Sequence, residues 1–235
     1  MVLPSAHSLS HRLAVLLILV SLPAAGAAEE PAEPFKTIEA AVQAKKLLRT
    51  QATDSGKGTF SEKLKKPSVL IGFELGLGRF LNIEVVYALR PIYLTPDGES
   101  VGAAHGLFPV DQKGGSLQSQ VSRTVKVKAK PGYALGGLTA RQGLLMNGMS
   151  LRFERLNGNR LDPRDSYSSD WIGDRTGGGE VSFNTKGMLA IGIHGSDRDG
   201  SCCAIGLIHL DSAAVLDLNA EPAKDLEKTS APKPE

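Results

Sequence analysis

The chain has 235 residues with 27 basic and 25 acidic side chains, so its formal net charge at neutral pH is only +2. This balance gives no electrostatic reason to expect a nucleic acid or an anionic membrane as a partner. The 26 glycines, together with the scarcity of helix-like stretches, favour a single all-β domain.

Residues 1–28 have the layout of a secretory signal peptide. Arg12 precedes an apolar run at residues 13–22, and small residues follow up to Ala28, as in a charged region, a hydrophobic region and a cleavage zone. We therefore expect a secreted or periplasmic protein. The run is short for a membrane span, so no stable membrane insertion is expected, although a retained N-terminal anchor is the alternative.

Residues 29–55 are predicted to form an N-terminal arm. Its apolar residues recur near one helical face, namely Ile38, Ala41, Val42 and Leu48. This spacing predicts a short amphipathic helix over residues 37–51 with Thr37 as its cap. The arm either packs on the domain or remains mobile. The glycine-rich residues 54–60 lack the Walker pattern, so we expect a turn there rather than a nucleotide site.

Three stretches within residues 56–212 repeat one design. Residues 69–93, 133–156 and 187–210 each place a strand, a glycine-bearing turn and a second strand of alternating polarity in the same order. Their spacing of about 60 residues predicts a pseudo-threefold β architecture.

Two segments between these hairpins also have informative sequence patterns. In residues 125–130, apolar side chains alternate with lysines, which predicts an edge strand with a solvated lysine face rather than an anion-binding stripe. His105 stands among glycines without a second histidine nearby, and such a residue is usually a solvated loop residue rather than a metal ligand.

Residues 161–174 are predicted to form the most charged loop. The segment contains four aspartates, Asp162, Asp165, Asp170 and Asp174, beside Tyr167 and the only tryptophan, Trp171. Carboxylates next to an aromatic ring suit binding of calcium and a sugar. The preferred interpretation is that the two aromatic residues anchor the loop while the aspartates stay in water.

The two cysteines, Cys202 and Cys203, are neighbours in the sequence. Free buried thiols, a strained adjacent disulfide and an intermolecular link are all compatible with this arrangement. Residues 213–235 lose the alternation and are rich in proline, lysine and glutamate, which predicts a disordered tail.

The three glycine-bearing hairpins and the closing Ala-Ile-Gly-Leu strand at residues 204–207 resemble the jacalin-related lectins. The resemblance covers residues 56–210. Three short segments, residues 132–138, 161–173 and 191–195, look closer still to uncharacterised secreted bacterial proteins. It implies an all-β fold, a β-prism of three four-stranded Greek-key sheets with pseudo-threefold symmetry.

The resemblance also implies candidate carbohydrate-binding residues in the turns. In the family, sugar sits beside a G-x-x-x-D turn, and aligning residues 204–207 places the expected aspartate on Cys203 and the expected glycine on Asp199, with Asp197 in the same loop. The other two hairpins carry G-x-x-x-N instead, at Gly78 with Asn82 and at Gly143 with Asn147. The alternative for these asparagines is that they tolerate the left-handed backbone of a tight turn.

The resulting hypothesis is a secreted, non-catalytic carbohydrate-binding module whose partners are glycans. The alternative is a structural or protein-interaction domain of the cell envelope without a sugar site. No cofactor, metal site or enzymatic activity is expected, because no nucleophile or acid/base pair stands in a recognisable context.

Overall fold

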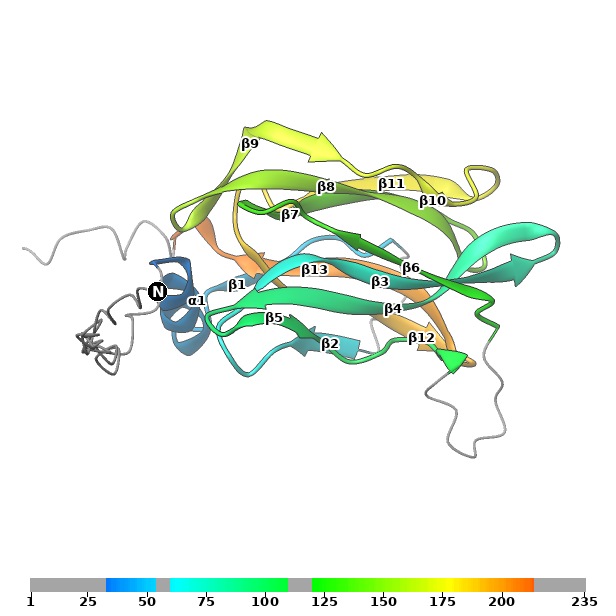
Figure 1. Ribbon diagram of the computed structural model, residues 1–235, viewed down its shortest axis with the longest axis horizontal. Helices are drawn as coiled ribbons and strands as arrows, with labels where there is room; N and C mark the ends of the chain where they lie inside the picture. The colour runs from blue at the N-terminus through cyan, green and yellow to red at the C-terminus, as the bar shows by residue number, and fades with distance from the viewer. Residues whose placement is uncertain (1–32, 54–59, 110–119, 214–235) are drawn as a thin grey trace, which may run out of the picture. The chain divides into compact units, whose positions relative to one another are not determined.

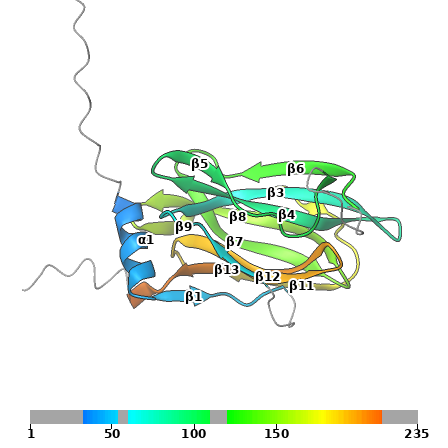
Figure 2. The same ribbon diagram turned by 90° about the horizontal axis from the view of Figure 1, so that it is seen from below.

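The computed structural model describes residues 33–53, 60–109 and 120–213, and these ranges contain thirteen strands and one α-helix. The predicted signal peptide, the glycine-rich residues 54–59 and the predicted tail beyond residue 213 lie outside the described residues. Figures 1 and 2 show the described strands arranged as long antiparallel ribbons, with the helix α1 lying across one end of them.

The first sheet is built around the hairpin of β3 (Val69–Phe80) and β4 (Ile83–Thr95). β5 (Gly98–Val101) pairs with the free side of β4, and β6 (Arg123–Lys128) pairs with the free side of β3. The spatial order β6-β3-β4-β5 is the order 4-1-2-3 that defines a Greek key. β6 is an outer strand with its lysines exposed, which confirms the prediction for that segment.

The second sheet repeats this order around the hairpin of β7 (Tyr133–Gln142) and β8 (Met146–Asn157). β11 (Gly179–Asn184) pairs with β7. β8 is flanked on its other side by β9 (Arg160–Ser168) and by the short β10 (Ile172–Gly173). Residues 161–174 are therefore mostly strand, and the predicted loop was wrong, because β8 supplies backbone partners to a segment whose side chains remain largely polar and exposed.

The third sheet has the same order but takes its strands from distant parts of the chain. Its central hairpin is β12 (Ala190–Arg198) with β13 (Ser201–Leu210). The outer strands are β1 (Leu47–Arg49), which pairs with β13, and β2 (Phe60–Lys63), which pairs with β12. If β12, β13, β1 and β2 are numbered 1 to 4 in that order, the spatial order β2-β12-β13-β1 is again 4-1-2-3.

The fold is therefore a β-prism of three four-stranded Greek-key sheets with pseudo-threefold symmetry, as predicted. Val86 of β4 lies opposite Met146 of β8, and this pairing joins the first and second sheets into one continuous nine-stranded sheet. Leu75, Leu135 and Leu207, one from each central hairpin, are fully buried and belong to the same core cluster. Burying each such side chain contributes about 1.5–3 kcal/mol, so the shared core holds the three sheets together.

The helix α1 (Glu33–Gln43) packs on this core through Phe35, Ile38 and Ala41, which are buried. Of the two predicted alternatives for the arm, packing on the domain is the observed one. The predicted helix limits of 37–51 were wrong, and Thr37 is a buried interior residue rather than a cap. The helix ends early because Lys45 adopts a left-handed backbone conformation (φ 56°), after which the chain extends into β1.

Candidate functional site

In the turn between β3 and β4, the glycine and the asparagine of the Gly-x-x-x-Asn motif both have structural roles. Leu81 and Asn82 form a two-residue turn between the paired Phe80 and Ile83, and both have positive φ, 47° and 72°. This is the type I′ turn in which asparagine is favoured for its backbone freedom. At Gly78 an added Cβ would lie 2.0 Å from the carbonyl oxygen of Gln120, so the glycine is required by a close approach of the chain.

The second turn uses its asparagine differently. Asn147 lies within β8, is only 6% exposed, and donates a hydrogen bond from Nδ2 to the carbonyl oxygen of Thr176 at 2.8 Å. The side chain of Asn147 also faces Gly143 across the turn. The two asparagines that the sequence motif equates therefore occupy different backbone environments, one in a left-handed turn and one in a strand.

The third turn buries one candidate and exposes another. Asp199 (φ 48°) and Gly200 (φ 76°) form a second two-residue turn between the paired Arg198 and Ser201, with Asp199 exposed. Cys203, where the family has its aspartate, is only 3% exposed. Both cysteines are buried and neither forms a disulfide, which corresponds to the expected alternative of buried thiols. Burial raises the pKa of the Cys202 thiol, so this thiol stays protonated.

Asp197 takes part in an ionic cluster with His105 and Glu62, which we call the His105 cluster; His105 is buried, Glu62 is partly buried and Asp197 is exposed. Nε2 of His105 lies 2.6 Å from Oε2 of Glu62, and Nδ1 lies 3.6 Å from Oδ2 of Asp197. Phe60 stacks on the imidazole with 3.7 Å between ring centroids. Glu62 also accepts a hydrogen bond from the backbone N–H of Ala103 at 2.8 Å.

The environment of His105 keeps its imidazole positively charged at neutral pH. Burial by itself lowers the pKa of His105, but the contacts with Asp197 and Glu62 outweigh it and raise the pKa to about 9. The prediction of a solvated loop residue was therefore wrong, since His105 is only 7% exposed. Glu62 is 43 residues away in the sequence, and no local pattern around His105 indicates that partner.

The four aspartates of residues 161–174 do not converge on one point. Asp162 accepts a hydrogen bond from the backbone N–H of Arg164, Asp165 accepts one from the hydroxyl of Tyr133, and Asp174 accepts two from Thr176. Within the described ranges, no group of three or more His, Cys, Asp or Glu residues is placed to hold a metal ion.

Tyr167 anchors this segment, as the preferred interpretation predicted. Its ring centroid lies 5.2 Å from those of Tyr133 and Phe153, and its hydroxyl accepts a hydrogen bond from the backbone N–H of Lys130 at 2.7 Å.

Trp171 and Asp170 instead line an open groove of about 500 Å³ between the first and second sheets. We call it the seam groove. One wall is formed by β6 and Glu84, the other by residues 169–173. Trp171 is half-buried, and its indole N–H donates to the carbonyl oxygen of Asp174 at 3.2 Å. The guanidinium carbon of Arg175 lies over the ring, 5.1 Å from its centroid.

The seam groove lies close to two of the predicted turns. The backbone N–H of Asp174 donates to the carbonyl oxygens of both Glu84 and Asn147, at 2.9 and 2.8 Å. Glu84 follows the first turn and Asn147 follows the second, so the groove begins where these two hairpins meet. The sequence had placed an aromatic residue among carboxylates here, but it gave no sign that β6 would form the opposite wall.

Glu84 is held on the groove wall by Arg123. Nε and Nη2 of Arg123 donate to the two carboxylate oxygens at 2.7 and 2.6 Å. The hydrogen bond from Arg123 lowers the pKa of Glu84. The wall therefore presents an ionised, geometrically fixed carboxylate at neutral pH.

The strand order and the groove define the class of this protein as a β-prism with an open polar groove along one seam. No family model and no curated protein matches the chain. Among the described residues, no helix is long and apolar enough to cross a membrane.

Several solved structures are similar to this chain in fold. Calystegia sepium agglutinin is 14% identical with a TM-score of 0.49, and the match covers 70% of this chain and 95% of the agglutinin. A mannose-binding lectin from Champedak is 13% identical with a TM-score of 0.46, covering 70% and 96%. A mannose-binding jacalin-related lectin from Ananas comosus is 11% identical with a TM-score of 0.45, covering 70% and 98%. The resemblance to secreted bacterial proteins is not tested by these matches.

Proposed function

We propose that this protein is a secreted or periplasmic, non-catalytic carbohydrate-binding module and that the seam groove is its binding surface. The observation that supports this proposal is the position of Trp171, half-buried along the groove beside Ser169 and Asp170. An aromatic face packs against the C–H groups of a sugar ring, and nearby carboxylate and hydroxyl groups hydrogen-bond to its hydroxyls.

The size and polarity of the groove suit a short oligosaccharide. Its volume of about 500 Å³ lies within the range of about 300–1,000 Å³ typical of ligand sites. The β6 wall adds the exposed ammonium groups of Lys126 and Lys128, each of which pairs with the carboxylate of Glu99, so charged groups of both signs lie along this wall. The open shape fits a chain of sugars better than a compact cofactor.

The electrostatics of the groove favour binding over catalysis. Glycoside hydrolysis requires one carboxylic acid that is protonated at working pH. Glu84 is the carboxylate fixed on one wall, and its lowered pKa keeps it ionised. Asp170, the carboxylate on the other wall, is exposed to solvent.

The alternative is a structural or protein-interaction domain of the cell envelope. It is favoured by the structural roles found for Gly78, Asn82 and Asn147, each of which is explained by backbone geometry or an internal hydrogen bond. This observation weakens the turns as sugar sites. It leaves the seam groove unaffected.

Trp171 is the only tryptophan in the chain, so its intrinsic fluorescence reports directly on the seam groove. Residues 29–235 would first be screened on a glycan array, and each positive oligosaccharide would then be titrated while tryptophan emission is recorded. We expect saturable binding with a shift in emission. Binding without any change in emission would place the sugar elsewhere, and absence of binding to any glycan would favour the alternative.

Two substitutions make the assignment specific. Asp170→Asn removes a carboxylate that lines the groove, whereas Asp162→Asn removes one from the same segment that does not line it. We expect about tenfold weaker glycan binding for Asp170→Asn and unchanged binding for Asp162→Asn. Asp199→Asn tests the exposed third turn in the same assay. Loss of glycan binding in that variant alone would show that the sugar binds at the turn and not in the seam groove.

A further inference from the structure

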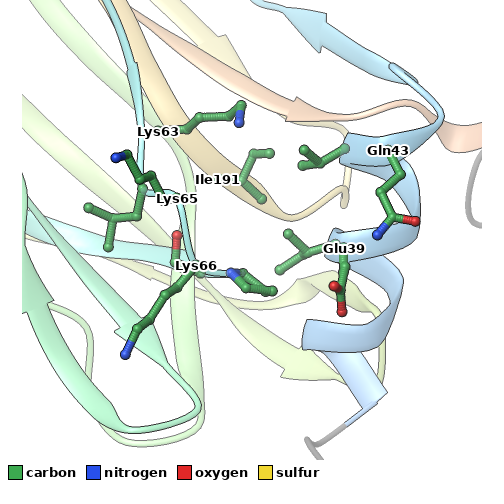
Figure 3. Close-up of a pocket in the computed structure, with 11 residues that line it drawn as sticks. Glu39, Gln43, Lys63, Lys65, Lys66 and Ile191 are labelled. Carbon is green, nitrogen blue, oxygen red and sulfur yellow. The ribbon is translucent and has the colours of Figure 1, made fainter.

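A second cavity lies at the other end of the sheets, beside α1. It has a volume of about 180 Å³ and lies between the helix and the connection from β2 to β3 (Figure 3). We call it the helix pocket. Its apolar lining comes from three elements and includes Ile38 and Val42 of α1, Leu64 of the connection and Ile191 of β12.

The rim of the helix pocket is predominantly basic. Lys63, Lys65 and Lys66 lie along the wall formed by β2 and the connection, while Glu39 and Gln43 lie on the helix across from them, as Figure 3 shows. Three lysines thus line one wall of an apolar interior, and one carboxylate lines the other. The ammonium group of Lys63 is directed toward the helix, whereas those of Lys65 and Lys66 are directed away from it.

The three lysines differ in whether they form an ion pair. Lys66 pairs with Asp97 at 2.5 Å. Lys63 and Lys65 have no ion-pair partner anywhere in the part of the chain that the structure describes. They can therefore neutralise an incoming anion without breaking an existing contact.

The volume limits what the apolar part of a ligand can be. A protein cavity of about 150 Å³ lined by aliphatic side chains binds benzene, so a pocket of about 180 Å³ has room for a group of roughly six to eight carbons. Burying such a group against Ile38 and Ile191 gives the affinity, and the lysine rim selects the charge.

We propose that the helix pocket binds a small amphipathic carboxylate, with its hydrocarbon part against the apolar lining and its carboxylate at Lys63 and, after rotation of its side chain, at Lys65. This site is separate from the seam groove and does not depend on carbohydrate binding. A ligand seated there contacts both α1 and the third sheet, so its binding also stabilises the docking of the helix.

The test uses sodium octanoate as the probe, followed by ¹H–¹⁵N correlation spectra of the folded chain. We expect saturable shifts of the amides in residues 38–43 and 63–66, with 1-octanol binding at least about tenfold more weakly because it lacks the charge. Equal affinity for octanol would overturn the role of the lysine rim, and no shifts at millimolar octanoate would overturn the site itself.

Variants separate the two contributions. Lys63→Gln with Lys65→Gln removes the uncommitted charges and should weaken octanoate binding about tenfold without changing octanol binding. Lys186→Gln, at an exposed lysine in the connection from β11 to β12, is the matched control and should bind octanoate like the unaltered chain. Val42→Phe fills the pocket from its helix side and should abolish binding of both probes. Retained octanoate binding in this variant, with an intact spectrum, would contradict the assigned pocket.

Discussion

Two ion pairs of equal length have different environments in this molecule. His105 and Glu62 are 2.6 Å apart with side chains 9% and 13% exposed, and Arg123 and Glu84 are also 2.6 Å apart but with side chains 52% and 35% exposed. Water screens the second pair and is largely excluded from the first. Distance alone therefore does not indicate what a pair contributes. The buried pair stabilises the fold, whereas the exposed pair is accessible to a ligand.

The largest effect is expected when one member of the buried pair is removed. His105→Ala leaves Glu62 and Asp197 near one another without the intervening cation and deletes the stacking with Phe60. We expect a loss of about 3–5 kcal/mol in the free energy of unfolding, measured by urea denaturation. The double variant Glu62→Gln with His105→Ala should lose less than His105→Ala alone. A loss below about 1 kcal/mol for His105→Ala would show that water reaches the cluster.

The pH dependence of stability sharpens the same comparison. The pKa of His105 is raised from 6.5 to about 9 in the folded protein. Its stabilising contribution is therefore fully present below pH 6.5 and is lost as the pH rises through about 9, with a total on the order of 3 kcal/mol. Denaturant midpoints between pH 6 and 10 measure this slope. His105→Ala should abolish it, and an unchanged slope in that variant would assign the titration to another group.

A smaller difference is expected between the two asparagines of the turns. Asn147→Ala leaves the carbonyl oxygen of Thr176 without its buried donor, so we expect a loss of about 1–2 kcal/mol. Asn82→Gly keeps the left-handed turn accessible and should change stability by less than about 0.5 kcal/mol. Thermal unfolding of both variants checks this order. Equal losses would mean that Asn82 makes an energetic contribution beyond its backbone conformation.

A small, salt-dependent effect is expected at the exposed pair. Arg123→Gln should reduce the free energy of unfolding by about 0.2–1 kcal/mol at low salt, and the difference should disappear near 1 M salt. Denaturation at two salt concentrations measures it, with Lys186→Gln as a control at an exposed lysine. A loss that survives high salt would show that Arg123 contributes through packing rather than charge.

The hairpins were predictable because their information is local. Alternating apolar residues in residues 69–93, 133–156 and 187–210 correspond to β3–β4, β7–β8 and β12–β13. The outer strands of the third sheet were not predicted, because β1 and β2 are short and their partners lie more than a hundred residues away.

The candidate site was harder to predict for the same reason. The G-x-x-x-N similarity equated Asn82 with Asn147, although only the carbonyl oxygen of Thr176 determines what Asn147 does. The need for glycine at Gly78 comes from Gln120, and the charge of His105 comes from Glu62 and Asp197. Side-chain roles that depend on distant partners leave no periodic signal in the sequence.

The third sheet takes its outer strands and its central hairpin from opposite ends of the domain sequence, which bears on how the domain folds. The first and second sheets each come from one continuous stretch, so their strands can pair as soon as that stretch is available. The third sheet needs β1 and β13 together, with Leu47 opposite Leu210. Pairs so distant in the sequence form slowly. We therefore expect closure of the prism to be a late step, because β1 has no partner strand until β13 is in place.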